Sequence, residues 1–333
     1  IGRKPQLRGH RGVLASPPMA SRSIHSRVWA ITSYFPFDEP AGTRRRLAAF
    51  RQFRACLGVP LAAVELAPTG RPHLDPGDAE LLVWAHAGDL LWQKERLLNV
   101  ALDALPDHCD TVAWIDCDVV LGNPRWPDEA RERLRDVALL QPFRRVFHLS
   151  SAVLPAAGDR SGLTHGLDAV AWRHAAGTLP DDVHSRQGLS SQFRYAPGMA
   201  WAASRDLLDR HGLYDAAILG SGDKLMFSAA CGRIDEATAA LRMTAGWRRH
   251  FRQWAEAFHG ATCGRIGHLE GDAWHLWHGD LRRRGYADRY AGFEAHDFDP
   301  AADLRIGTDG AWHWNSDKPP LHAFVRRYVA PRA

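Results

Sequence analysis

The feature that most constrains this sequence is a short apolar run that ends in two acids. Residues 111–115 read Thr-Val-Ala-Trp-Ile, and Asp116 and Asp118 follow with Cys117 between them. Side chains alternate along a strand, so both acids are expected to point the same way, with Cys117 turned into the core. Buried carboxylates are costly unless their charge is compensated. A divalent cation would compensate both and leave positions open for a diphosphate; the plain alternative is a strand that runs into an acidic turn.

The pattern around this run predicts an α/β fold. Residues 28–34 and 61–66 read as strands, with a helix over 44–57 between them. A second helix is expected from near Trp84 to Leu105, just before the acidic strand. Strands that alternate with helices predict a mostly parallel central sheet flanked by helices, which binds ligands at the carboxyl ends of its strands.

Composition excludes several classes of protein. No apolar stretch reaches the ~18 residues that span a bilayer, so no transmembrane segment is expected. Five cysteines without a CxxC pair indicate reduced thiols and a cytoplasmic location, with peripheral attachment to the inner membrane as the other option. A net charge of +4 suits an anionic ligand such as a nucleotide diphosphate but is too small to indicate nucleic-acid binding.

Five motifs follow one another in a recognisable order. They are Thr32 to Tyr34 on the first strand, Lys94 and Asn99 on a helix, Asp116-Cys117-Asp118, Gly220-Ser221-Gly222-Asp223, and the His-rich residues 274–279 before Arg282 to Arg289. In this order the chain resembles glycosyltransferases of the GT-A fold that carry an Asp-x-Asp (DXD) motif, especially family 2-like and GalNAc-transferase-like members. The resemblance covers roughly residues 28–290.

The resemblance implies a GT-A, Rossmann-like sheet with a C-terminal extension on the acceptor side. It divides the chain into a disordered leader over 1–27, a glycosyltransferase domain over 28–300, and a tail over 301–333 that packs on the domain. Residues 1–27 are rich in Arg, Gly, Ser and Pro and lack the apolar region of a secretory signal.

The resemblance also implies a metal site for Mn²⁺ or Mg²⁺. Asp118 would be the direct ligand, and Asp116 would bind ribose, a sugar hydroxyl or the metal, directly or through water. Of two late histidines, His278 matches the family's metal ligand better than His275, and residues three apart on a strand cannot both reach one ion. An imidazole beside carboxylates suits Mn²⁺ better than Mg²⁺.

Asp223 follows a Gly-rich turn and opens a helix. Its structural alternative is an N-cap. In inverting members of the family the matching acid takes the proton of the acceptor hydroxyl, which is general base catalysis. In a retaining enzyme Asp223 would bind a substrate hydroxyl instead, and the sequence leaves this choice open.

The remaining donor contacts come from the resemblance as well. It implies that the nucleotide or its phosphates are contacted by Thr32, Tyr34, Glu65, Lys94, Asn99, Asp116 and Arg282. Lys94 has a solvated helix position as its alternative, and the arginines from Arg282 to Arg284 could equally be a solvated turn. One of these arginines could clamp the diphosphate with two hydrogen bonds.

The function expected from the sequence is a hexosyl- or N-acetylhexosaminyltransferase that uses a nucleotide sugar, with UDP-sugars favoured. A bacterial envelope glycan or a small metabolite is the expected acceptor, by analogy alone; protein and nucleic-acid acceptors stay open. A nucleotidyltransferase would carry a Gly-rich basic loop after the first strand, and Phe35-Pro36-Phe37-Asp38 is not one. A zinc hydrolase lacks its HExxH motif here, and a non-catalytic carbohydrate- or nucleic-acid-binding protein would not need Asp116 and Asp118 together.

Overall fold

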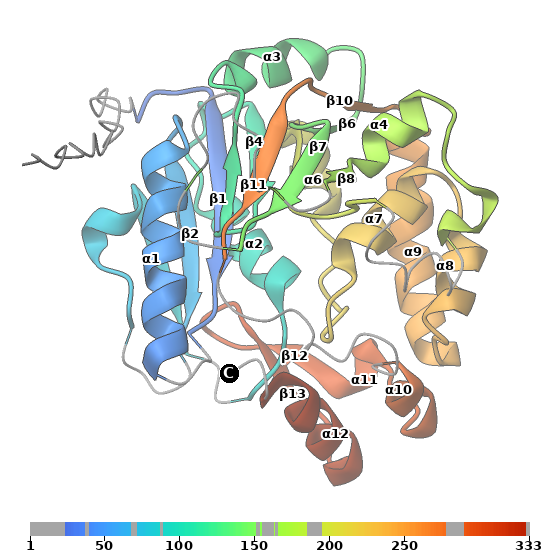
Figure 1. The fold of residues 1–333 in the computed structure, drawn as a ribbon. Helices are drawn as coiled ribbons and strands as arrows, with labels where there is room; N and C mark the ends of the chain where they lie inside the picture. The colour runs from blue at the N-terminus through green and yellow to red at the C-terminus, as the bar shows by residue number, and fades with distance from the viewer. Residues whose placement is uncertain are drawn as a thin grey trace, which may run out of the picture.

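The computed structural model describes residues 24–36, 40–67, 72–86, 89–150, 154, 163, 166–184, 195–277 and 290–330 (Figure 1). The predicted leader, up to residue 23, lies outside these residues. So do two residues with predicted site roles, His278 and Arg282.

A seven-stranded sheet forms the centre of the fold, in the order β10-β6-β9-β4-β1-β2-β3. Its strands are β1 Val28–Tyr34, β2 Leu61–Leu66, β3 Leu81–Ala85, β4 Thr111–Ile115, β6 Leu139–Gln141, β9 Ala200–Ser204 and β10 Ile266–His268. Every neighbouring pair is parallel except those of β9, which runs antiparallel to β4 and β6. The predicted α/β class with a mostly parallel sheet is therefore confirmed.

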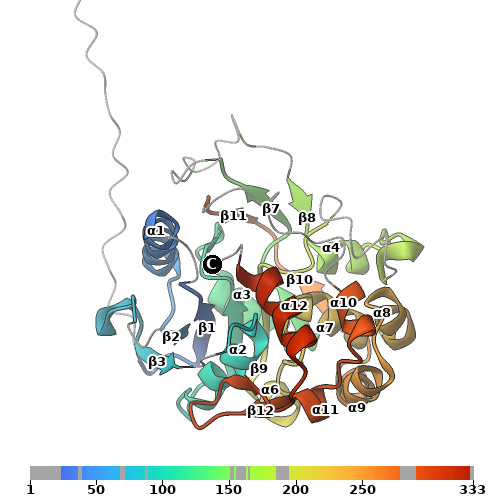
Figure 2. The ribbon, with the colours of Figure 1, turned by 90° about the horizontal axis from the view of Figure 1, so that it is seen from below.

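Helices cover both faces of this sheet (Figures 1 and 2). On one face, α1 (Pro40–Cys56) and α3 (Trp126–Arg133) contribute to the hydrophobic core that contains Ala30 and Tyr34 of β1. The opposite face meets Trp29 and Ile31. Its helices are α2 Lys94–Asp103, α4 Val170–Ala175, α6 Arg205–His211, α7 Gly222–Ala230, α8 Ile234–Ala240 and α9 Ala245–Thr262. Strand alternation thus divides the apolar residues of β1 between two cores.

The strand order places a ligand site before any side chain is considered. From β1 the chain adds β2 and β3 on one side, then crosses back to place β4 on the other side of β1. The order of strands reverses between β1 and β4, and open α/β sheets bind ligands at such a reversal, beyond the carboxyl ends of the strands. Asp116 and Asp118 follow the last residue of β4, so they lie at this point.

A second, four-stranded sheet lies beside the first, in the order β5-β11-β7-β8. Its strands are β5 Val119–Leu121, β7 Arg145–His148, β8 Leu167–Asp168 and β11 Asp272–His275. Because β5 begins directly after Asp118, the carboxylates occupy the junction between the two sheets.

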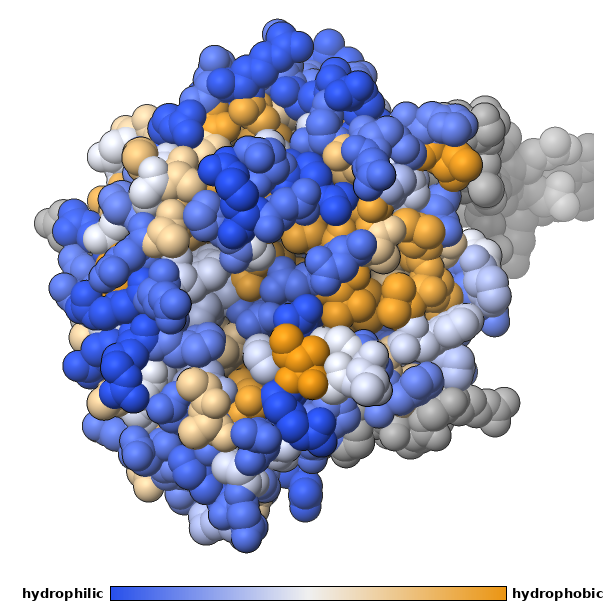
Figure 3. Space-filling model, turned by 180° about the vertical axis from the view of Figure 1, so that it is seen from behind, coloured by the Kyte–Doolittle hydropathy of each residue, from blue (hydrophilic) through white to orange (hydrophobic). Residues whose placement is uncertain are grey.

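The helix predicted from near Trp84 is wrong in its first part. Residues 81–85 form β3, which pairs parallel with β2, and α2 starts only at Lys94. Aliphatic and aromatic residues also suit strands, and a short apolar run does not distinguish the two structures until a partner strand is known. As the edge strand, β3 leaves Trp84 38% exposed. An apolar area surrounded by polar side chains is visible on the back of the molecule (Figure 3).

The C-terminal segment packs against the helix that starts at Lys94. It comprises α10 Ala291–Ala295, α11 Pro300–Asp303, β12 Leu304–Ile306, β13 Trp312–Trp314 and α12 Pro319–Val329. The buried Gln93 pairs with the backbone of Trp312: the Trp312 N–H donates to Gln93 Oε1 at 2.6 Å, and Gln93 Nε2 donates to the Trp312 carbonyl. Leu321 and Val325 enter the same core as α2. None of the helices described combines the length and the apolar content of a membrane span.

Candidate functional site

One lysine joins two of the predicted site acids. Lys94 Nζ lies 2.6 Å from Asp116 Oδ1 and 2.9 Å from Asp223 Oδ2. The three residues come from the start of α2, the end of β4 and the start of α7. An ammonium with two carboxylate partners fixes the relative positions of elements that are far apart in the sequence.

The backbone around Asp223 is shaped for close approach. Gly220 and Ser221 have φ angles of 91° and 76°, which turn the chain sharply before α7 begins at Gly222. A Cβ at Gly222 would lie 2.0 Å from Glu95 Oε1, so only glycine lets α7 pack this closely on α2. Asp223 then stands in the first turn of α7, beside Lys94.

A residue with a strained backbone conformation, Met199, lies beside Asp116. Met199 has a φ of 79°, a left-handed conformation that costs a non-glycine residue about 1–3 kcal/mol. Its carbonyl accepts the N–H of Asp116 at 2.8 Å. A Cβ at the preceding Gly198 would lie 2.9 Å from Asp223 Oδ2. Such strain is retained where the surroundings demand it, and here it keeps the 198–199 backbone against the Asp116 N–H and the Asp223 carboxylate.

Burial and neighbouring charges shift the pKa values of the residues in this site. Burial raises the pKa of Asp116 to about 6, with Lys94 opposing the shift and Asp223 and Asp118 adding to it. Burial also raises the pKa of the adjacent Glu95 to about 8. For Lys94, burial works toward a lower pKa, but the neighbouring carboxylates outweigh it and raise the pKa well above its usual value. Perturbed pKa values that cluster at the carboxyl end of a sheet are typical of a functional site.

Asp118 has a histidine beside it. His275 Nε2 lies 3.6 Å from Asp118 Oδ1, and the Leu276 N–H donates to the Asp118 carbonyl at 2.7 Å. The structure therefore places the less favoured of the two candidate histidines next to the acid, while His278 is outside the described residues. A carboxylate oxygen with an imidazole nitrogen is a donor set that fits Mn²⁺. Among the residues that the structure describes, no group of three or more such side chains gathers around one point, so the protein groups described would hold an ion only in part.

Three residues predicted to contact the donor make hydrogen bonds or packing contacts within the protein. The Thr32 hydroxyl donates to the Ile115 carbonyl at 2.7 Å and ties β1 to β4 just before Asp116. Tyr34 is buried in the α1 core, edge-on to Phe50. The fully buried Glu65 accepts the N–H groups of residues 73 and 74 at 2.7 and 2.9 Å. These contacts support the shape of the site and favour structural roles over direct donor contacts.

The contacts of Asn99 also favour a structural role. Its Oδ1 accepts the Leu213 N–H at 2.8 Å, and its Nδ2 donates to the Leu213 carbonyl and to Asp215. The side-chain amide is thus bound to the segment that leads toward α7. The sequence pattern identified the helix but did not show which side of it faces Asp116 and Asp223. Cys117 packs beside the α1 core, as expected, although residues 116–118 form a turn between β4 and β5 and do not continue the strand.

Two residues at this site were not singled out from the sequence. Glu95 looks like an ordinary helix-surface acid, yet its side chain is buried under Gly222. His148 at the end of β7 lies 3.2 Å from His275, between their Nδ1 atoms. One signal for Glu95 was available, because residues 220–222 contain two glycines where a helix has to pack closely.

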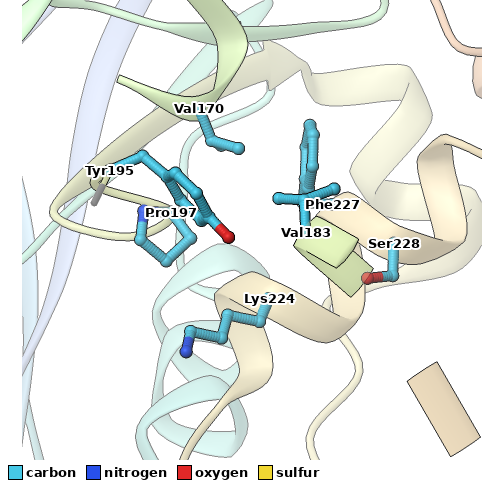
Figure 4. Close-up of a pocket in the computed structure, with 7 residues that line it drawn as sticks. All are labelled: Val170, Val183, Tyr195, Pro197, Lys224, Phe227 and Ser228. Atoms are coloured by element: carbon cyan, nitrogen blue, oxygen red, sulfur yellow. The ribbon is translucent and has the colours of Figure 1, made fainter. Parts of the chain in front are cut away.

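Two cavities lie near α7, away from the carboxylates. The smaller, of about 10 Å³, has room for one water molecule; it is lined by Val170, Val183, Tyr195, Pro197, Lys224, Phe227 and Ser228 (Figure 4). The larger, of about 450 Å³, lies at the C-terminal end of α7 and shares Val183 with the first. Neither lining includes Asp116, Asp118 or Asp223.

Comparison with known proteins finds similarity only to solved structures. No protein-family model and no curated protein matches the sequence. Among solved structures, S. aureus TarS aligns over 60% of this chain and 32% of its own, at 13% identity with a TM-score of 0.31. S. aureus TarS 1-349 in complex with UDP-GlcNAc aligns over 92% of this chain and 72% of its own, at 9% identity with a TM-score of 0.33. Both scores are low, so the similarity by itself decides neither fold nor function.

Proposed function

We propose that this chain is a metal-dependent glycosyltransferase that moves a sugar from a nucleotide-diphosphate sugar, with UDP-sugars favoured, to a hydroxyl of an acceptor. One observation carries the proposal. Lys94 bridges Asp116 and Asp223 at the carboxyl end of β4, where the strand order reverses, and Asp118 lies two residues after Asp116. A sheet reversal that carries paired carboxylates and an ammonium suits an anionic nucleotide with a cation.

Each residue has a distinct task in this reaction. Asp118 and His275 would hold Mn²⁺ or Mg²⁺, which supplies neutralisation of the charge that builds on the departing diphosphate. Asp116 would bind the donor sugar or ribose, or the ion through a water. Lys94 keeps Asp116 and Asp223 together, and its ammonium would also attract the donor phosphates.

Asp223 would receive the proton of the acceptor hydroxyl. Its side chain is 20% exposed, so a hydroxyl can approach it from the solvent side while Lys94 orients it. A base positioned within hydrogen-bond reach of the attacking hydroxyl contributes on the order of 10²–10⁴-fold to the rate. The acceptor we propose is a glycan or a small molecule.

The test is a panel of nucleotide sugars with and without Mn²⁺. UDP-glucose, UDP-galactose, UDP-GlcNAc, UDP-GalNAc and GDP-mannose would each be incubated with the protein, and release of UDP or GDP followed. We expect metal-dependent release from one or a few of these donors, lost in Asp118→Ala and retained in Asp107→Asn, which changes an exposed acid outside the site.

Other outcomes identify the competing functions. Release of pyrophosphate from a nucleoside triphosphate and a sugar phosphate would indicate a nucleotidyltransferase. Binding of sugars or nucleotides without any release would indicate a non-catalytic binding protein. Release that Asp118→Ala leaves unchanged would remove the carboxylate cluster from the reaction.

A further inference from the structure

The small sheet places a second histidine beside His275. Strand β11 pairs antiparallel with β5 and parallel with β7, and in these registers His275 lies opposite Val119 on one side and His148 on the other. Asp118 directly precedes Val119. The sheet therefore gathers Asp118, His275 and His148 from three segments that are far apart in the sequence.

Side-chain contacts follow this register. The Nδ1 atoms of His148 and His275 are 3.2 Å apart, and the two ring centroids are 4.7 Å apart. On its other side, His275 Nε2 faces Asp118 Oδ1 at 3.6 Å. The Leu149 N–H donates to the His275 carbonyl at 3.0 Å, so the backbone holds the pair as well. The side chain of His275 is only 10% exposed, which leaves its ring little freedom to turn.

The short Nδ1–Nδ1 distance links the protonation of the two rings. A neutral imidazole has one N–H and one lone pair, so a hydrogen bond between the two Nδ1 atoms requires one ring to donate and the other to accept. If His275 donates, its Nε2 carries the lone pair that faces Asp118. If His275 accepts, its Nε2 carries the proton and the N–H faces Asp118. Only the first arrangement lets His275 bind a cation there.

We propose that His148 is a positioning residue that accepts the Nδ1–H of His275 and so keeps the His275 Nε2 lone pair directed at the cation site of Asp118. The proposal rests on the metal site of the proposed function and deepens it. Histidines that bind metals usually donate their other N–H to a fixed acceptor, and removal of such an acceptor typically costs 10–100-fold in metal affinity.

Four variants test the proposal by metal binding rather than by activity. His148→Leu removes the acceptor, while His148→Asn keeps an oxygen near the position of Nδ1. Asp118→Ala removes a ligand. His174→Leu is the control, because His174 on α4 is another half-buried histidine, and its Nε2 contacts the Gly264 carbonyl. Mn²⁺ affinity would be measured by electron paramagnetic resonance with UDP present, at a pH well above the ordinary histidine pKa of about 6.5.

We expect His148→Leu to weaken Mn²⁺ binding by about 10–100-fold, His148→Asn to restore most of it, and His174→Leu to bind like the parent. Long-range proton–nitrogen NMR of the rings, with His275 assigned through His275→Ala, should show an Nδ1–H tautomer in the parent. In His148→Leu it should show Nε2–H.

The failures are distinguishable. If Asp118→Ala loses Mn²⁺ but His148→Leu binds like the parent, or if His148→Asn loses as much as His148→Leu, the role of His148 is wrong and the metal site stands. An Nε2–H tautomer of His275 in the parent would also overturn that role. If Asp118→Ala binds Mn²⁺ like the parent, the metal site itself fails.

Discussion

Replacement of Gly222 by alanine tests how α7 is held against α2. The added Cβ would lie 2.0 Å from Glu95 Oε1, 2.2 Å from its Cδ and 2.6 Å from its Cγ. Because the stem as well as the carboxylate is too close, rotation of the carboxylate alone does not relieve the overlap. Forced repacking of this kind costs about 1–3 kcal/mol. The better helix propensity of alanine returns at most about 1 kcal/mol, so we expect a net loss of about 1–2 kcal/mol.

Urea unfolding followed by tryptophan fluorescence measures this loss, since the chain has 13 tryptophans. The midpoint should fall while the slope with urea stays constant. Gly260→Ala in α9 is the matched control, because a Cβ there meets nothing within 4 Å. This control should gain about 0.4–1 kcal/mol, as compatible glycine replacements do.

The same substitution in a Glu95→Ala protein tests whether overlap with Glu95 causes the loss of stability. In Glu95→Ala the overlapping atoms are gone, so the further change Gly222→Ala should cost little, and the two substitutions should be strongly non-additive. Parent-like stability of Gly222→Ala, or the same loss in both backgrounds, would refute the packing of Glu95 under Gly222.

Three further predictions concern the same site. Burial raises the pKa of Glu95 from 4.5 to about 8, so between these pH values the native state binds a proton that the unfolded state has lost. The free energy of unfolding should therefore fall as the pH rises through that range. Glu95→Gln should flatten this fall, measured as urea midpoints, and an equal fall in the variant would contradict the prediction. Asn99→Ala should cost about 1–3 kcal/mol of stability through its lost bonds to Leu213 and Asp215 while the donor KM stays constant; a raised KM at unchanged stability would restore its donor role. Asp223→Asn should lower turnover about 10²-fold or more with near-normal binding of Mn²⁺ and UDP, and parent-like turnover would leave Asp223 as a helix-start acid.

Several features of this protein follow from local sequence. The strands predicted at 28–34 and 61–66 have the bounds of β1 and β2, because continuous apolar runs bounded by turn residues are typical of buried parallel strands. The position of Asp116 and Asp118 at a sheet edge follows from the same pattern. These features depend on residues within a few positions of each other, so strand periodicity and turn chemistry suffice to predict them.

Other features depend on pairing between distant segments. Residues 81–85 are a strand because β2 offers them a partner, and no local pattern contains that partner. Lys94 faces Asp116 and Asp223, while Asn99 on the same helix faces Leu213, because the packing of α2 decides which of its sides meets the carboxylates. Helix periodicity predicts which residues share a face but not what that face meets.

The pair of His148 and His275 shows the limit most clearly. The two residues are 127 positions apart, and each by itself reads as an isolated histidine near the end of a strand. The sequence by itself determined that a strand would present two carboxylates at the edge of an α/β sheet. The tertiary structure decided which lysine, glutamate and histidines surround them, because sheet register and helix packing bring together side chains that the chain separates by tens to more than a hundred residues.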